Sequence, residues 1–252
     1  ELVRRIASQA DVVVENFRPG VMDRLGLGYE SLQVENPGLV YASVSGFGQT
    51  GPDREKPGYD MIVQAMSGSM HVSATEEQGA VKVAFPVSDI VAALFTSNAI
   101  VAALLERTRT GTGRYLEVSL LEAMLCAQSN LAGSVLLTDC DPPRVGLAQG
   151  NIVPYQLFRC GDGAIVCGAL NEPMWVRFAK ALDREEWTRD ARFLTNPDRT
   201  RNRAVLVPLI EEVLTGADAA DWIARLEAHG IPCGPVLSLR EALELEQVSA
   251  RG

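Results

Sequence analysis

The chain has 252 residues, of which 47% are hydrophobic, and a formal net charge of −9 at pH 7. This apolar content is enough to bury a sizeable core in one large or two smaller domains. The acidic excess argues against sequence-independent binding to nucleic acid or to anionic lipid, because both need clusters of lysine and arginine. We therefore expect small-molecule or protein partners, with no nucleic acid and no membrane.

The ends of the chain and its cysteines bear on location and on metal binding. The N-terminus lacks the basic-then-apolar order of a signal peptide, and no apolar run approaches the roughly 20 residues of a membrane-spanning helix, which favours the cytoplasm. Five scattered cysteines and only two histidines predict reduced thiols and no metal site. Because Glu1 and Gly252 both fall at helical patterns, we expect residues to be missing at both ends.

Helical and strand patterns alternate along the first half of the chain, which predicts an α/β fold. The β-branched run at 12–14 predicts a buried parallel strand, and 39–45 predicts a second strand. Further helices are expected at 2–8, before Leu25, and at 29–35, 60–70, 89–105 and 120–137, and further strands at 81–85 and 114–119. The helix at 120–137 is apolar enough to be buried on most sides.

A stretch rich in proline, aspartate and glycine, at 139–154, predicts a domain boundary. It separates a large domain, 1–140, from a smaller one, 141–252. In the smaller domain a β-hairpin is expected at 155–170, helices at 173–182, 200–214 and 219–229, and a rigid extended connection at 231–236.

Asp89 lies between Val87-Ser88 and a long helical pattern, which leaves two interpretations open. Position alone favours a helix cap formed by Ser88 or Asp89. Alternatively, the helix dipole and nearby N–H groups stabilise an ionised carboxylate as an oriented nucleophile. A carboxylate needs no separate general base, so the absence of a Ser-His-Asp pattern does not exclude covalent catalysis.

Two segments after predicted strands are candidates for ligand binding. Asn16-Phe17-Arg18, followed by Arg24, offers arginines whose planar fork suits phosphate. The glycine-rich loop at 45–52, with Gly46 and Gly48, leaves the carboxyl end of a strand, where open α/β sheets bind ligands. Taken singly, each segment is more typical of an ordinary turn with solvated arginines, and the loop matches neither the dinucleotide fingerprint nor the P-loop.

Taken in order, the motifs resemble those of the family III CoA-transferases (CaiB/BaiF, formyl-CoA transferase-like). The resemblance rests on Val-Glu-Asn-Phe-Arg-Pro-Gly at 14–20, Ser-x-Ser-Gly-Phe-Gly-Gln-Thr-Gly-Pro at 43–52, Pro-Gly-Tyr-Asp at 57–60, Gln-Ala-Met-Ser-Gly at 64–68, Asp89, Glu-Arg-Thr-Arg-Thr-Gly-Thr-Gly-Arg at 106–114, Val-Ser-Leu-Leu-Glu-Ala at 118–123, Pro-Tyr-Gln-Leu-Phe at 154–158 and Gly-Asp-Gly at 161–163. It covers nearly the whole chain. The set in this order is far more specific than any one motif.

The resemblance implies a Rossmann-like open sheet in a large domain that is incomplete here, and a smaller α+β domain. It also implies that the complete chain returns to the large domain and forms a homodimer of two interlocked rings. Its nucleophilic aspartate falls on Asp89. Its CoA-binding residues fall on Asn16, Phe17, Arg18 and Arg24, with Tyr59, Gly46 and Gly48 lining the site.

Tyr59 separates two activities of this family. In the related acyl-CoA racemases the equivalent residue is a histidine that acts as an acid and base on the α-carbon. Tyrosine is a poor base, so transfer is favoured over racemisation. The chain also departs from the family pattern at Ala148-Gln149-Gly150, where a His-Pro pair is usual before Pro154.

The implied activity moves CoA from an acyl-CoA donor to a carboxylic acid, through an aspartyl anhydride and an aspartyl-CoA thioester. CoA and acyl-CoA are then substrates, and no tightly bound cofactor is expected. Three alternatives remain: an acyl-CoA racemase of the same fold, a CoA-binding subunit without turnover, and an unrelated nucleotide-binding domain. The donor and acceptor acids are not predicted.

Overall fold

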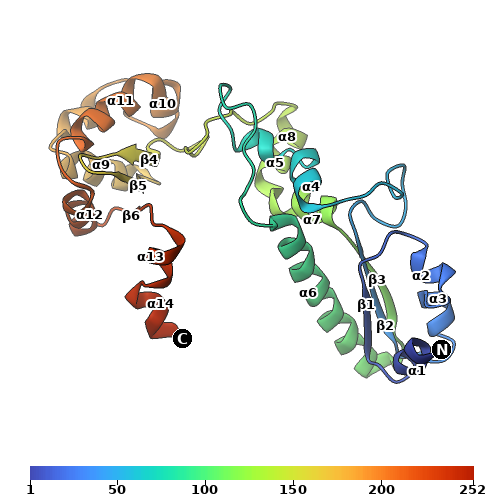
Figure 1. The fold of residues 1–252 in the computed structure, drawn as a ribbon. Helices are drawn as coiled ribbons and strands as arrows, with labels where there is room; N and C mark the ends of the chain where they lie inside the picture. The colour runs from blue at the N-terminus through green and yellow to red at the C-terminus, as the bar shows by residue number, and fades with distance from the viewer. The chain divides into compact units, whose positions relative to one another are not determined.

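The computed structural model describes residues 1–252, and the chain divides into two compact units (Figure 1). The first unit is Glu1–Arg144 and the second is Val145–Gly252. Each unit has its own sheet and its own buried apolar side chains, as an independent domain requires.

The first unit is built on a three-stranded parallel sheet with the order β1-β2-β3. The strands are β1 (Val12–Glu15), β2 (Val40–Ser45) and β3 (Arg114–Ser119). The register sets Glu15 beside Ser43 and Ser43 beside Glu117, so these three residues form a row near the carboxyl ends. Because β1 is an edge strand, the prediction that it is fully buried was wrong, and Val14 is 57% exposed.

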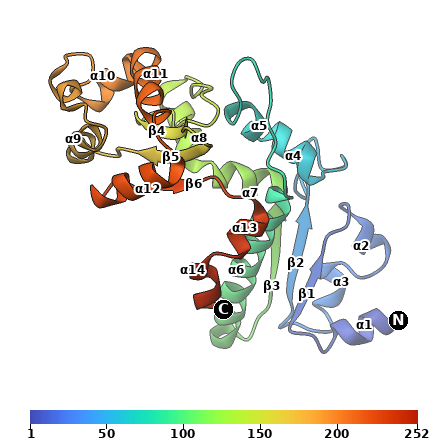
Figure 2. The same ribbon diagram turned by 60° about the vertical axis from the view of Figure 1, so that its left-hand side comes forward.

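Helices cover both faces of this sheet (Figures 1 and 2). They are α1 (Leu2–Ala7), α2 (Val21–Arg24), α3 (Tyr29–Leu32), α4 (Asp60–Met66), α5 (Ser69–Val72), α6 (Val87–Thr110), α7 (Leu120–Ala127) and α8 (Ser129–Thr138). Side chains alternate across β2. Tyr41 packs on one face with Leu32 of α3, and Val44 packs on the other with Ala92 of α6.

The long helix α6 carries the predicted signals at its C-terminal end. Arg107 and Arg109 lie in the last turn, and Gly111 follows with a φ of 72°, the left-handed conformation that favours glycine. By length and composition α6 is the one helix that could cross a membrane, whereas the sequence prediction found no such run. This is a weak indication, because apolar helices of soluble proteins meet the same criterion.

Three other predicted elements of this unit were wrong. The expected strand at 81–85 has no partner strand, and the Val83 N–H instead donates to the Gln64 side chain at 2.9 Å. The expected helix at 60–70 is interrupted at Gly68, where φ is 79°. The expected helix at 120–137 breaks at Gln128 into α7 and α8, which meet at 80°, and α8 buries none of its residues.

The second unit contains an antiparallel sheet with the order β4-β5-β6. Its strands are β4 (Tyr155–Arg159), β5 (Ala164–Gly168) and β6 (Cys233–Pro235). The predicted hairpin is confirmed as β4 and β5. The segment at 231–236 is not only an extended connection, because β6 lies within it and sets Cys233 opposite Cys167 of β5.

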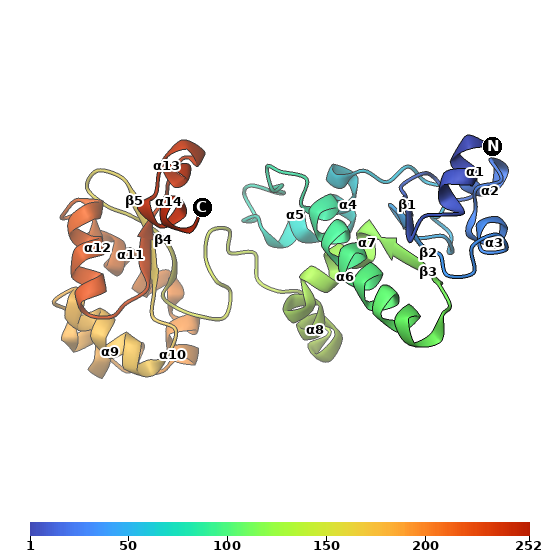
Figure 3. The ribbon, with the colours of Figure 1, turned by 90° about the horizontal axis from the view of Figure 1, so that it is seen from below.

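The helices α9 (Glu172–Ala181), α10 (Asn196–Arg201), α11 (Arg203–Leu214) and α12 (Ala219–Ala228) lie beside this small sheet (Figure 3). The 3-10 helix η1 (Glu185–Arg189) follows α9, and α13 (Leu239–Leu243) and α14 (Glu246–Arg251) follow β6 and bury none of their residues. The single helix expected at 200–214 is interrupted at Asn202, so α10 and α11 are separate. Trp175, Phe178 and Ile165 are among the side chains that fill the core.

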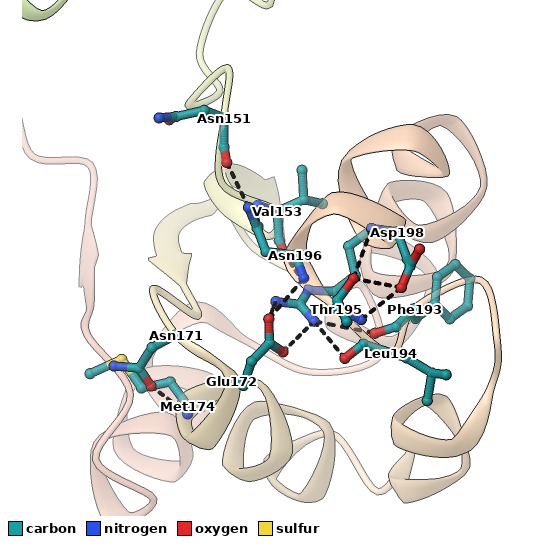
Figure 4. A network of polar contacts seen from close by, with 11 residues as sticks. Asn151, Val153, Asn171, Glu172, Met174, Phe193, Leu194, Thr195, Asn196 and Asp198 are labelled. Atoms are coloured by element: carbon teal, nitrogen blue, oxygen red, sulfur yellow. Dashed lines mark hydrogen bonds and ion pairs between the residues drawn. The ribbon is translucent and has the colours of Figure 1, made fainter.

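A fully buried arginine organises one side of this unit. Figure 4 shows the network of polar contacts there, with Val153, Glu172 and Phe193 labelled. Arg199 donates from Nε to the Val153 carbonyl oxygen at 2.7 Å and from Nη1 to the Phe193 carbonyl oxygen at 3.2 Å and to Glu172 Oε2 at 2.9 Å. Its guanidinium also lies 4.8 Å from the centre of the Trp175 ring. The side chain thereby connects the segment before β4 with α9 and α10.

Candidate functional site

The carboxyl end of the first unit's sheet carries a polar cavity of about 250 Å³. The loops after β1 and β2, the segment before α4 and the start of α6 all meet at this end (Figures 1 and 2). The lining residues are Asn16, Phe17, Arg18, Pro19, Ser45, Gly46, Arg54, Lys56, Pro57, Gly58, Tyr59, Asp89 and Leu120. A ligand edge at the carboxyl ends of parallel strands is the general rule for open α/β sheets.

Most of the residues predicted for the site line this cavity. Asp89, Tyr59 and Gly46 lie there together with Asn16, Phe17 and Arg18. Arg24 and Gly48 do not line it. Arg24 lies at the end of α2 with its guanidinium near Gly20, and Gly48 has a φ of 92° and donates its N–H to Ser45 Oγ at 3.1 Å.

Neither Ser88 nor Asp89 caps α6 with its side chain. The helix begins at Val87 after Pro86 and has no side-chain cap of its own at this end. Asp89 is the third helical residue, is exposed to the cavity, and its carboxylate takes part in no hydrogen bond or ion pair within the chain. The interpretation that it caps the helix with its side chain is therefore wrong, and its oxygens have no partner within the chain.

Asp60 of α4 supplies the missing cap from outside the helix. Its Oδ1 accepts hydrogen bonds from the Ser88 N–H at 3.0 Å and from Ser88 Oγ at 2.9 Å, while Oδ2 accepts from Gln64 Nε2 at 2.8 Å. Gln64 and Ser88 are both buried, so the arrangement is shielded from water. Asp60 thus fixes the backbone next to Asp89. Asp60 belongs to the motif at 57–60, but the sequence predicted no role for it in the site.

The surroundings of Asp89 favour its protonated form. Partial burial raises the pKa of this carboxyl group, and the charge of Asp60 raises it further. This direction is opposite to the effect of the helix dipole expected from the sequence. The ionised form of Asp89 is accordingly more basic, and more nucleophilic, than that of an exposed aspartate.

Replacing Asp60 by asparagine is expected to shift the acidic limb of the activity profile to lower pH. Removing a negative neighbour lowers the pKa of Asp89, so its ionised form, which the sequence resemblance implies to be the nucleophile, persists to lower pH. The measurement is kcat against pH from 4 to 8 for the wild type and Asp60→Asn, and the acidic limb of the variant is expected at lower pH than that of the wild type. Asp141→Asn, which removes an exposed carboxylate outside the cavity, should leave the limb in place.

Three cations line the cavity that contains Asp89. Arg54 and Lys56 line it together with Arg18, although the chain as a whole carries a net charge of −9. Their own ion pairs, with Glu55 and Asp53, are at the exposed surface and are therefore weak. The cavity is suited to an anionic ligand. Arg54 and Lys56 were not predicted as site residues, although both follow the glycine-rich loop at 45–52 within a few positions in the sequence.

Asp89 also borders a second, largely apolar cavity of about 470 Å³ between α6 and the sheet. Its lining residues are Val14, Asn16, Val44, Asp89, Ala92, Ala93, Thr96, Ser97, Ile100, Val101 and Leu120. The carboxylate is thus reached from a polar side and from an apolar side. A ligand with a charged part and an uncharged acyl part would meet both surfaces.

Gly46 is required where the loop after β2 touches the segment before α4. A Cβ atom at Gly46 would lie 2.5 Å from the Cα atom of Gly58, far inside contact distance. Gly46→Ala is therefore expected to separate the two walls of the cavity and to weaken the binding of CoA, the ligand that the sequence resemblance implies, about tenfold or more. Calorimetric titration with free CoA checks this. In Gly133→Ala the added methyl meets no atom within 4 Å, so the dissociation constant should be unchanged.

Comparisons with known proteins agree with this geometry. The family described as CoA-transferase family III matches residues 1–252. The chain is 37% identical over 251 residues to the succinyl-CoA:glutarate CoA-transferase of Mus musculus, covering 100% of this chain and 58% of that protein. It is 38% identical over 252 residues to the acetyl-CoA:oxalate CoA-transferase of Acetobacter aceti, covering 100% of this chain and 64% of that protein.

Solved structures give the same result for the fold. A CaiB/BaiF family protein from Brucella suis superposes with a TM-score of 0.86 at 37% identity, covering 100% of this chain and 66% of that one. A protein from Mycobacterium tuberculosis superposes with a TM-score of 0.88 at 29% identity, covering 99% and 67%. The chain spans roughly six-tenths of the length of the curated relatives it matches. Its fold, its cavity and its sequence together place the chain in CoA-transferase family III.

Proposed function

We propose that the protein transfers CoA between carboxylic acids, with Asp89 as the covalent nucleophile. The observation that carries this proposal is a carboxylate with no partner in the chain, held at the start of α6 between a cationic cavity and an apolar one. A group that served only the fold would be expected to pair with a donor. Asp89 instead faces the space where a ligand binds.

The proposed reaction has four steps in which one acyl bond replaces another. Asp89 attacks the donor thioester carbonyl, which gives an acyl-aspartyl anhydride and releases CoA thiolate. The thiolate attacks the aspartyl carbonyl, which releases the donor acid and forms an aspartyl-CoA thioester. The acceptor carboxylate attacks this thioester, giving a second anhydride and the thiolate again. The thiolate then attacks the acceptor's acyl carbonyl, which releases the new acyl-CoA and restores the Asp89 carboxylate.

The residues around Asp89 support these steps in different ways. Arg18, Arg54 and Lys56 would attract the anionic CoA and would keep it bound while its thiolate is free between the steps. The raised pKa of Asp89 makes its carboxylate a better nucleophile than an exposed one. Two anhydrides form, and each would be lost by hydrolysis, so the acyl group must be shielded from water. The apolar cavity beside Asp89 suits that need.

Tyr59 bears on the alternative of an acyl-CoA racemase. Its side chain is 69% exposed and lines the cavity that contains Asp89, at the position where the resemblance puts a histidine in racemases. A phenol is a poor base for removing an α-proton at neutral pH. Loss of α-deuterium from a 2-methylacyl-CoA in ordinary water would favour the racemase, and retention of the label favours transfer.

Trapping of the covalent intermediate tests the proposal. The protein is incubated with an acyl-CoA donor and then with hydroxylamine, and its peptides are examined by mass spectrometry. A hydroxamate on Asp89 that depends on the donor is expected. CoA binding without modification by any donor would instead favour a CoA-binding subunit without turnover.

The names of the relatives suggest which substrates to try first. Two are named for glutarate or oxalate as the acid, with succinyl-CoA or acetyl-CoA as the thioester. We propose dicarboxylic acids as acceptors on this basis, with succinyl-CoA as the first donor in the trapping experiment. The interlocked homodimer implied by the family resemblance and the cytoplasmic location favoured by the sequence belong to the same proposal for the whole protein, and sedimentation analysis would test the dimer.

A further inference from the structure

Two carboxylates on the sheet hold the two loops that form one wall of the cavity. Glu15 ends β1, and Glu117 lies in β3, with Ser43 of β2 between them in the register. Glu15, Ser43 and Glu117 are in register with one another, and Ser43 lies two positions from Tyr41 along β2. All three side chains therefore project to the face of the sheet that carries Tyr41 and α3. The row therefore lies behind the cavity and does not line it.

Each carboxylate accepts a hydrogen bond from the backbone of one loop. Glu15 Oε2 accepts from the Phe17 N–H at 2.7 Å, in the segment that carries Arg18. Glu117 Oε1 accepts from the Gln49 N–H, in the glycine-rich loop that follows β2. The segment after β1 and the loop after β2 both contribute residues to the polar cavity.

Two side chains join these contacts into one chain of hydrogen bonds. Ser43 Oγ donates to Glu15 Oε1, and Gln49 Nε2 donates to Ser43 Oγ at 2.7 Å. Gln49 thus connects the Glu117 side to the Glu15 side through both its backbone and its side chain. The hydrogen bonds therefore run without a break from one loop to the other, through Glu15, Ser43, Gln49 and Glu117.

The Glu15 carboxylate is held by hydrogen bonds alone. It is only 9% exposed, and none of the ion pairs in the chain involves it. A buried carboxylate without a cation must obtain its donors from neighbouring N–H and O–H groups, and such charge-assisted bonds are strong and directional. Burial, followed by the charge of Glu15, raises the pKa of Tyr41 on the same face.

We infer that Glu15, Ser43, Gln49 and Glu117 are positioning residues that set the spacing of the two cavity loops and thereby the affinity for CoA. The inference rests on the proposed function, because it takes CoA as the ligand of the polar cavity. These residues act through Phe17, Arg18 and Gly46 and do not touch the ligand themselves. Their loss should weaken CoA binding without removing the nucleophile.

The test measures CoA affinity directly, by calorimetric titration of the full chain with free CoA. Glu15→Gln replaces one acceptor with a donor, and Gln49→Met keeps the length of the side chain but removes its amide. Each variant is expected to raise the dissociation constant about tenfold. In kinetics the same change should appear in the KM for acyl-CoA, with kcat at saturation within about twofold of wild type.

A double-mutant comparison separates a connected chain from independent contacts. Ser43→Ala and Gln49→Met remove the two partners of one hydrogen bond. If the four residues act as one chain of hydrogen bonds, the double variant should bind CoA no more weakly than the weaker-binding single variant. If the contacts are independent, the increases in the dissociation constant should multiply. Asp162→Asn is the matched control, because Asp162 Oδ1 also accepts a backbone N–H, that of Ala219 at 2.8 Å, but in the second unit.

The outcomes distinguish this inference from the proposed function. A wild-type chain that binds no CoA overturns both. A wild type that binds CoA, with folded Glu15→Gln and Gln49→Met variants that bind it equally well, overturns the inference alone. If Glu15→Gln does not fold, Gln49→Met decides, because Gln49 is only half-buried and its loss should leave the fold intact. If the two single-variant increases in the dissociation constant multiply in the double variant, the residues do not act as one connected chain of hydrogen bonds, and this outcome also overturns the inference.

Discussion

Replacing Asp89 by asparagine is expected to lower kcat for CoA transfer by at least about 1,000-fold. The amide keeps the volume of the side chain but removes the nucleophilic carboxylate, so no anhydride can form. Affinity for CoA should stay within about threefold of wild type, or become tighter, because a negative charge leaves a cavity lined by Arg18, Arg54 and Lys56. Transfer kinetics and calorimetric titration measure the two quantities separately.

The same experiment discriminates among the alternatives. Asp141→Asn removes a carboxylate from an exposed position that lines no cavity, and its kcat should equal that of the wild type. An Asp89→Asn variant that retains transfer would exclude the covalent mechanism. Loss of CoA binding in this variant, together with loss of activity, would instead assign Asp89 a binding role.

Replacing Arg199 by methionine is expected to reduce the free energy of unfolding of the second unit by about 3 kcal/mol. The carbonyl groups of Val153 and Phe193 lose their donor inside the protein, and the stacking on Trp175 is lost as well. All three tryptophans of the chain lie between Trp175 and Trp222. Urea unfolding followed by tryptophan fluorescence therefore reports on this unit alone.

Arg192 provides the matched control for this prediction. It also stacks on an aromatic ring, with its guanidinium 4.9 Å from the centre of Phe193, and it pairs with Asp190, but its side chain is 53% exposed. Arg192→Met should therefore lower the free energy of unfolding far less than Arg199→Met does. Equal losses in the two variants would contradict the role given to the buried guanidinium.

The elements predicted well are those whose signals are local. Val40–Ser45 and Arg114–Ser119 are strands because β-branched and aromatic residues alternate there, and α6 stops at Gly111 as its capping residues indicate. The strand expected at 81–85 also alternates, but a strand exists only where another strand supplies hydrogen-bond partners. Conversely, two prolines in the segment at 231–236 hid β6, which β5 stabilises by pairing with it.

The residues of the candidate site also divide into those that a sequence motif predicts and those that only distant contacts in the fold bring into place. Motif order placed Asp89, Asn16 and Arg18 at the carboxyl end of the sheet, where the cavity lies. The contact between Asp60 and Ser88 joins residues 28 positions apart, and no local pattern announces it. The buried Arg199 was equally invisible, because arginine is normally exposed and only the folded unit supplies its carbonyl partners.

The cap that Asp60 provides also links the surroundings of Asp89 to the folding of the chain. The first turn of α6 has unsatisfied N–H groups and would fray until α4 docks beside it. Asp89 lies in that turn. A partly folded or locally opened chain would therefore leave its carboxylate mobile and in water, and the raised pKa would arise only once the contact between residues 60 and 88 has formed.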